Sequence, residues 1–235
     1  MMEMTEMFAK IRRYGAAWLC AGTVLASAWL PGTAVYASET EFHLDLDYIL
    51  SYEQQQCSDM IFFGDSRVVG MSLYAGGYHY VGQTSAGYSW MSSEGASRLE
   101  QMMQEWPQAD VVFCFGVNDL GNIDSYISWF DSFQANHPGR RCWYLSVNPV
   151  SERTAAANGY SVRNYMIDAF NQRLIDAFPD RYLDTYSIVM EYGAGTWDGV
   201  HYDGTTYASI EDCTWRAIME KLDAENAAAA QNGGN

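Results

Sequence analysis

The chain has 235 residues, of which 49% are hydrophobic, 18% charged and 15% aromatic. This apolar and aromatic content excludes wholesale disorder, and five cysteines are too few for a disulfide-dense miniprotein. The formal net charge of −16 disfavours nucleic-acid binding and adsorption to anionic membranes, since both need a basic surface. The length suits one domain with a short appendage.

The first 37 residues have the order of segments found in a secretory signal peptide. A basic patch at residues 10–13 precedes an uncharged run over 14–30, and small residues lead to Ala37. We predict cleavage after Ala37, which would leave residues 38–57 as an acidic N-terminal segment of a secreted protein. An uncleaved membrane anchor is the alternative, because the uncharged run is near the lower length limit for a span.

From residue 58 onward, short apolar runs alternate with amphipathic segments. Runs typical of buried strands lie at residues 60–63, 78–81, 111–115, 142–147 and 181–184. Helical patterns lie at residues 67–74, 91–105, 122–136, 160–177 and 204–224. Apolar strands separated by helices indicate a parallel sheet covered on both faces, so we predict one α/β domain over 58–225. Residues 226–235 consist mainly of Ala, Gln, Asn and Gly, and we expect a disordered tail there.

The first polar motif, Gly64-Asp65-Ser66, directly follows the first predicted strand. The glycine permits a tight turn, and the next helix would begin near Ser66. One interpretation makes Ser66 the N-cap of that helix. The other makes it a nucleophile, because a hydroxyl at a strand-to-helix turn is surrounded by backbone N–H groups.

Two further motifs follow the second and third predicted strands. The glycine of Thr84–Tyr88, Gly87, is either an ordinary loop glycine or a backbone N–H donor that no side chain obstructs. The asparagine of Gly116–Asp119, Asn118, can cap the next helix or direct its amide at a developing oxyanion.

The last motif, Asp198-Gly199-Val200-His201, precedes the final predicted helix. A carboxylate three residues from an imidazole on a turn can fix its tautomer and stabilise it once it is protonated. The alternative is a surface histidine beside a helix-capping aspartate. Adding Asp203 would make a poor metal site, because catalytic metals need more histidine or carboxylate ligands.

Four cysteines lie beyond the predicted signal peptide, at Cys57, Cys114, Cys142 and Cys213. The apolar run around Cys114 favours a buried free thiol. Disulfides can form outside the cell, and Cys57 with Cys142 is the pair to test first. The spacings match no zinc-binding pattern, so we expect no metal there.

In chain order the motifs supply a Ser, a Gly, an Asn and an Asp/His pair. This order, at these strand ends, resembles the SGNH-hydrolase superfamily, also called the GDSL family, whose four sequence blocks are named for these residues. The resemblance extends over residues 59–222; each block is short, but the four in order are specific. It implies a flavodoxin-like, three-layer α/β/α sandwich around a five-stranded parallel sheet.

The resemblance also implies a role for each residue. Ser66 matches the nucleophile, His201 the general base and Asp198 the residue that orients the base. The backbone N–H groups of Ser66 and Gly87 and the side chain of Asn118 match the oxyanion hole. A second candidate for the glycine is Gly82.

Two kinds of residue point to the substrate. Arg67 follows the nucleophile where the family name has Leu, so we expect a more polar and cationic entrance. Aromatic residues near the motifs suit stacking on sugar rings, or else simply fill the core. The candidate substrate-binding residues are Arg67, Tyr88, Trp90, Trp197 and Tyr202.

The sequence therefore predicts a secreted serine ester hydrolase that works through an acyl-enzyme and removes acetyl or other small acyl groups from carbohydrates or small esters. No cofactor or metal is expected, and neither is a nucleic-acid partner or stable membrane insertion after signal cleavage; we expect a monomer. An O-acyltransferase with the same Ser/His/Asp site is one alternative. A non-catalytic extracellular glycan-binding domain is the other.

Overall fold

The apolar runs form one sheet within residues 59–232, the part of the chain that the computed structural model describes. Its five strands are β1 (Met60–Gly64), β2 (His79–Gly82), β3 (Asp110–Cys114), β4 (Cys142–Leu145) and β5 (Tyr182–Leu183). All neighbours pair in parallel, in the order β2-β1-β3-β4-β5. Parallel neighbours need a long connection that crosses from the end of one strand to the start of the next, and such a connection usually contains a helix.

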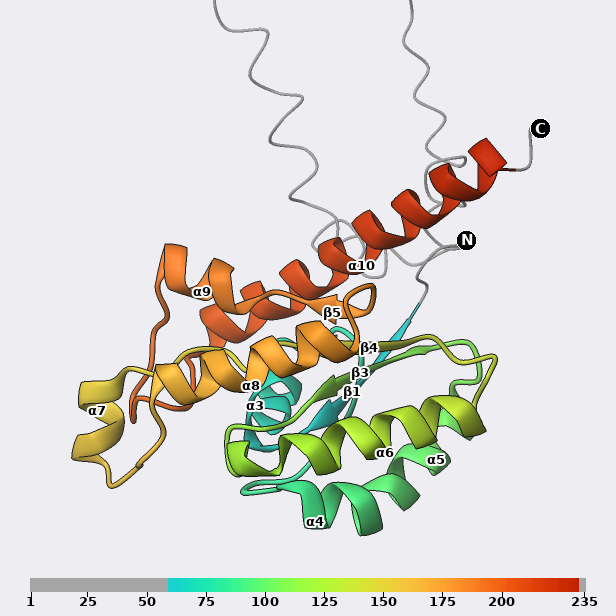
Figure 1. Ribbon diagram of the computed structural model, residues 1–235. Coiled ribbons are helices and arrows are strands. Elements are labelled where there is room, and N and C mark those ends of the chain that lie inside the picture. The colour runs from blue at the N-terminus through green and yellow to red at the C-terminus, as the bar shows by residue number, and fades with distance from the viewer. Residues whose placement is uncertain (1–58, 233–235) are drawn as a thin grey trace, which may run out of the picture. The chain divides into compact units, whose positions relative to one another are not determined.

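Helices account for most of the remaining described chain (Figure 1). They are α3 (Ser66–Tyr74), α4 (Tyr88–Trp90), η1 (Met91–Gly95), α5 (Ala96–Glu105), η2 (Leu120–Asn122), α6 (Ile123–Asn136), α7 (Glu152–Ala157), α8 (Asn164–Ala177), α9 (Tyr186–Tyr192) and α10 (Gly204–Asn232). Within residues 59–232, no helix has both the length and the apolar character needed to cross a membrane.

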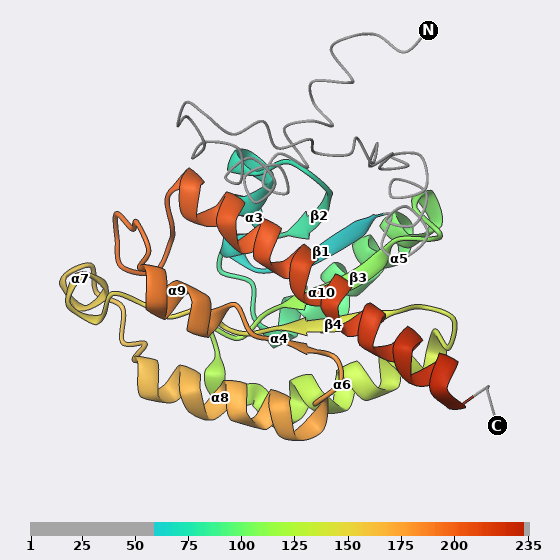
Figure 2. The same ribbon diagram turned by 90° about the horizontal axis from the view of Figure 1, so that it is seen from above.

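Alternate residues of the strands face two separate cores, because successive side chains of a strand point to opposite faces. On β1, Ile61 and Phe63 pack in a core with side chains of α5, α6 and α8. Met60 and Phe62 pack in the other core with side chains of α3, α9 and α10. Figure 2 shows α10 lying across the strands on this second face. The predicted three-layer α/β/α arrangement with a five-stranded parallel sheet is confirmed.

The carboxyl ends of the three neighbouring strands β2, β1 and β3 are level with one another. Gly64 at the end of β1 is in register with Gly82 of β2 and Cys114 of β3. The loops that follow these strands consequently leave the sheet from one edge. Three of the four polar motifs lie in those loops.

The structure corrects several predicted boundaries. Strand β4 ends at Leu145 rather than residue 147, and α8 begins at Asn164 rather than residue 160. The side chain of Asn164 accepts a hydrogen bond from Val150 N–H at 2.8 Å and donates to Val150 C=O at 3.1 Å. These bonds attach the helix start to the segment after β4.

The predicted disordered tail is helical over residues 226–232, where α10 continues to Asn232. The reason is composition: this stretch is rich in alanine, which has the highest helix propensity. The predicted signal peptide (residues 1–37), the acidic segment (38–57) and Cys57 lie outside the described residues. Cys142 is buried, Cys114 and Cys213 are partly buried, and all three are free thiols.

Candidate active site

Ser66 is held at a tight strand-to-helix turn. A Cβ atom on Gly64 would lie 2.4 Å from Val68 Cγ2 and 2.5 Å from the Cys114 carbonyl oxygen, so only glycine fits there. The N-cap of α3 is Asp65, whose Oδ1 accepts a hydrogen bond from Arg67 N–H at 2.9 Å. The interpretation of Ser66 as the N-cap is therefore wrong. Ser66 is the first helical residue, and its hydroxyl is available for another contact.

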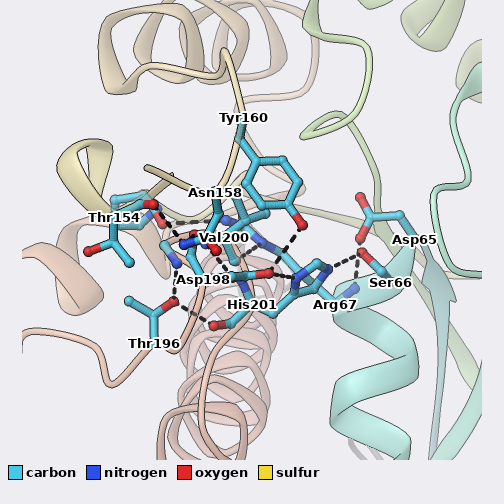
Figure 3. Close-up of polar contacts among 12 residues, drawn as sticks. Asp65, Ser66, Arg67, Thr154, Asn158, Tyr160, Thr196, Asp198, Val200 and His201 are labelled. Atoms are coloured by element: carbon cyan, nitrogen blue, oxygen red, sulfur yellow. Dashed lines mark hydrogen bonds and ion pairs between the residues drawn. The ribbon is translucent and has the colours of Figure 1, made fainter. Parts of the chain in front are cut away.

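That contact is with a histidine 135 positions further along the chain. Ser66 Oγ lies 2.8 Å from His201 Nε2, and His201 Nδ1 lies 2.6 Å from Asp198 Oδ2 (Figure 3). The structure thus brings the first and last sequence motifs together as a continuous Ser–His–Asp chain. In such a chain the imidazole can take the serine proton while the carboxylate stabilises the resulting imidazolium.

Asp198 uses its second oxygen to shape the loop that carries the histidine. Its Oδ1 accepts the backbone N–H groups of Val200 and His201, both at 2.8 Å. Burial raises the pKa of Asp198, but the hydrogen bonds from the His201 ring and from these two N–H groups outweigh it and lower the pKa to about 2. The carboxylate is consequently ionised at neutral pH. Thr196 also supports the loop, since its Oγ1 donates to the His201 carbonyl at 2.6 Å.

Two aromatic rings flank the histidine. Tyr160 donates a hydrogen bond from its hydroxyl to Asp198 Oδ2 at 3.2 Å, and its ring lies edge-on, 6.4 Å from the His201 ring (Figure 3). Desolvation and the Asp198 carboxylate raise the pKa of Tyr160, which keeps it protonated as a donor. The Trp197 ring is stacked with the imidazole, with 5.9 Å between the ring centroids, and Trp197 is 59% exposed.

The loops after β2 and β3 are joined by side-chain hydrogen bonds. Asn118 Nδ2 donates to the Ala86 carbonyl at 2.8 Å, and Asp119 Oδ2 accepts Tyr88 N–H at 2.7 Å. A Cβ atom on Gly87 would lie 2.6 Å from Asp119 Oδ2, so the close approach of the two loops requires glycine. Asn118 is exposed, and its amide has a second N–H besides the one that donates to Ala86. Gly82, the other glycine considered, closes β2 instead.

The predicted substrate-binding residues have different surroundings. Trp197 is exposed beside His201, whereas Tyr88 and Trp90 are partly buried and pack against the core under α5 and α6. Arg67 and Tyr202 are 8% and 1% exposed, which removes both from the surface that a substrate can reach. The expected cationic entrance is therefore absent at Arg67, because the first turn of α3 directs this side chain inward.

Sequence reasoning missed Tyr160, which lies in a segment predicted to be helical. No pattern around it signals a contact with a loop nearly 40 residues away. Within residues 59–232 no group of three or more His, Cys, Asp or Glu side chains is placed to hold a metal ion. Asp203 accepts the Thr206 N–H at 2.8 Å in the first turn of α10.

No family model matches the chain, and no curated protein sequence matches it. A structure described as a platelet activating factor from Streptococcus pneumonia has 15% identity and a TM-score of 0.54, covering 76% of this chain and 98% of that one. The lipase/acylhydrolase from Enterococcus faecalis has 14% identity and a TM-score of 0.54, covering 68% and 94%. An acetyl xylan esterase has 15% identity and a TM-score of 0.49, covering 68% and 99%. At the identities of the first two structures the likeness shows the fold alone, an α/β fold.

Proposed function

We propose that this protein is a secreted serine ester hydrolase of the SGNH type. The observation that carries the proposal is the chain of hydrogen bonds from Ser66 through His201 to Asp198. A serine hydroxyl is a weak nucleophile alone and needs a base within hydrogen-bond reach. His201 satisfies that requirement, and the ionised Asp198 orients it.

The reaction would proceed in two steps. His201 takes the Ser66 proton as the hydroxyl oxygen attacks the ester carbonyl, and then gives that proton to the departing alcohol. The Asn118 amide and the backbone N–H groups of Ser66 and Gly87 are the proposed donors to the tetrahedral oxyanion. Water, activated by His201, then attacks the acyl-Ser66 ester, releases the carboxylic acid and restores the serine.

We propose acetyl or other small acyl esters of carbohydrates as the substrates. Trp197 and Tyr160 support this choice, since both present exposed ring surface beside His201, where the departing alcohol must receive its proton. Aromatic faces of this kind suit a sugar ring.

Hydrolysis of p-nitrophenyl acetate by the full chain tests the proposal. Ser66→Ala should lower kcat by at least about a hundredfold, and by up to about 10⁶-fold if the full effect of losing a triad serine is reached. Asn118→Ala should lower kcat by about 10²–10³-fold, because one oxyanion donor is lost. A fluorophosphonate probe should label the wild type at Ser66.

The matched control is Ser72→Ala, because Ser72 is an exposed serine on the same helix whose hydroxyl donates to Val69 C=O. This variant should hydrolyse the ester and take the probe like the wild type. Turnover that is equal in wild type and Ser66→Ala, with no labelling at Ser66, would contradict the proposal and favour a glycan-binding domain. Transfer of the acyl group to an added sugar, in place of release as acid, would indicate the acyltransferase.

A further inference from the structure

The residue directly after the proposed nucleophile carries a buried positive charge. The Arg67 side chain is only 8% exposed, and its three guanidinium nitrogens all donate to backbone carbonyls. Nε lies 3.1 Å from the Val200 carbonyl oxygen, Nη1 2.8 Å from that of Asn148 and Nη2 3.4 Å from that of Pro149. A guanidinium so enclosed cannot meet a substrate and has to act through the protein.

These carbonyls belong to two segments that converge on the site. Val200 immediately precedes His201, and the other two residues lie in the segment that follows β4. The two segments also contact each other, because Ser151 N–H donates to the Gly199 carbonyl at 2.9 Å. Arg67 thus connects helix α3, which carries Ser66, to the loop that carries the base (Figure 3).

We propose that Arg67 is a positioning residue, which holds the His201 imidazole within hydrogen-bond distance of Ser66 by fixing the Val200 carbonyl to the first turn of α3. The proposal rests on the proposed function for its kinetic consequences. Its structural content, the position of His201 relative to Ser66, does not depend on that function.

The surroundings of the guanidinium explain why an arginine is needed. Three carbonyl dipoles and the Tyr202 ring, whose centroid is 4.9 Å away, stabilise the buried charge. The Tyr202 hydroxyl also donates to Pro149 C=O, which fixes one of the acceptors. A planar fork can donate in three directions at once, whereas a lysine ammonium is a point charge on a flexible stem. Arg67→Lys should therefore recover only part of the function.

The test compares two variants in the full chain. Arg67→Met keeps an aliphatic side chain and removes the guanidinium, whereas Arg67→Lys keeps a positive charge. We expect Arg67→Met to lower kcat by about 10- to 100-fold, the cost of misplacing a catalytic group by roughly 1 Å. KM should change by less than about twofold, because Arg67 does not touch the substrate. The kcat of Arg67→Lys should lie between that of Arg67→Met and that of the wild type.

Chemical rescue provides a readout that a general loss of packing would not give. Arg67 lines a small internal cavity with Ser146 and Asn148, so truncation to alanine enlarges an existing space. Methylguanidinium should raise the kcat of Arg67→Ala several-fold, whereas methylammonium should leave it unchanged. The matched control is Arg98→Met, since Arg98 is an exposed arginine on α5 that pairs with Glu94.

A crystal structure of Arg67→Met, or of Arg67→Lys if the first variant does not fold, gives the direct answer. We expect the distance between Ser66 Oγ and His201 Nε2 to exceed about 3.5 Å, beyond hydrogen-bond range. An unchanged distance near 2.8 Å would overturn the proposal, whatever the activity of the protein. A folded Arg67→Met with wild-type kcat would overturn it as well. If the wild type itself lacks Ser66-dependent turnover, the proposed function fails and the distance alone decides the role of Arg67.

Discussion

Asp65 is the most strongly buried carboxylate beside the proposed nucleophile. It is 2% exposed, and its Oδ1 accepts the Arg67 N–H at the start of α3. Burial raises its pKa from the ordinary 3.8 to about 6, against the opposing effect of the Arg67 charge. Its proton is therefore bound more tightly in the folded than in the unfolded chain.

This raised pKa predicts how stability changes with pH. The contribution of Asp65 is fully present below about pH 4 and is lost as the pH rises through about 6, because the unfolded chain releases the proton first. Asp65→Asn keeps the cap oxygen and cannot ionise. We expect the stability of the wild type relative to Asp65→Asn to fall by about 2 kcal/mol between pH 4 and pH 7.

Urea unfolding of both proteins at several pH values measures this difference. Every other carboxylate is common to the two chains, so its titration cancels in the comparison. A stability difference that stays constant with pH would show that Asp65 ionises in the folded state as readily as in the unfolded state.

The sequence could identify residues whose role follows from a local motif, and it failed where the role depends on distant contacts. Ser66 and His201 were predicted from their motifs, and the structure brings them within hydrogen-bond distance. Arg67 and Tyr202 were expected at the entrance because they adjoin those residues, but adjacency does not determine burial. Tyr160 reaches the site from the loop before α8, which no periodicity reveals.

At the level of elements, the apolar runs predicted all five strands because a strand buried on both faces needs a continuous apolar segment. Helices α7 and α9 were missed, since six or seven residues contain too few turns to show a helical period. Their positions depend on packing. α7 begins where the segment after β4 meets the loop of Asp198.

The contact between α7 and this loop needs a glycine. Gly199 has φ +89°, and a Cβ atom there would lie 2.2 Å from Ala155 N of α7. Gly199→Ala should therefore destabilise the fold by roughly 3 kcal/mol, from left-handed backbone strain together with the clash. It should also lower ester hydrolysis, because His201 is two residues away. Thermal unfolding and p-nitrophenyl acetate turnover measure the two effects.

The matched control separates strain from the clash. Gly193 has a similar φ of +80°, but no atom of residues 59–232 lies within 4 Å of its added Cβ. Gly193→Ala should cost about 1–3 kcal/mol, from backbone strain alone, and leave turnover unchanged. If both variants lose the same stability and activity, close packing against α7 does not matter for the loop.

For the molecule as a whole, topology explains why motifs far apart in the chain meet. The parallel order places the ends of β2, β1 and β3 at one edge, and the loop before α10 brings His201 to the same edge. Strand order cannot be read from the apolar runs, because many orders satisfy the same pattern. The alternation of apolar strands and helices predicted the α/β class, and the resemblance to a known family supplied the three-layer, flavodoxin-like arrangement.

The whole chain also carries a large excess of negative charge, with a formal net charge of −16 at pH 7. Like charges repel within the folded protein, and the repulsion acts over a Debye length that shrinks from about 30 Å at 0.01 M salt to about 8 Å at 0.15 M. Exposed ion pairs such as Arg98–Glu94 and Arg216–Asp212 are weakened by the same screening. Pairs of this kind contribute less than about 1 kcal/mol each, so repulsion should dominate.

Raising NaCl from 10 to 200 mM at pH 7 should therefore stabilise the protein by roughly 1 kcal/mol, which corresponds to a rise in Tm of about 2–4 °C for a chain of this size. Calorimetry at the two salt concentrations measures the shift. The control is the same pair of scans near the isoelectric point of about 4.4, where the net charge is close to zero and the rise should disappear. A Tm that falls with salt at pH 7 would mean that attraction between specific ion pairs outweighs the net repulsion. An equal rise at both pH values would indicate a general effect of the salt on burial rather than screening of the net charge.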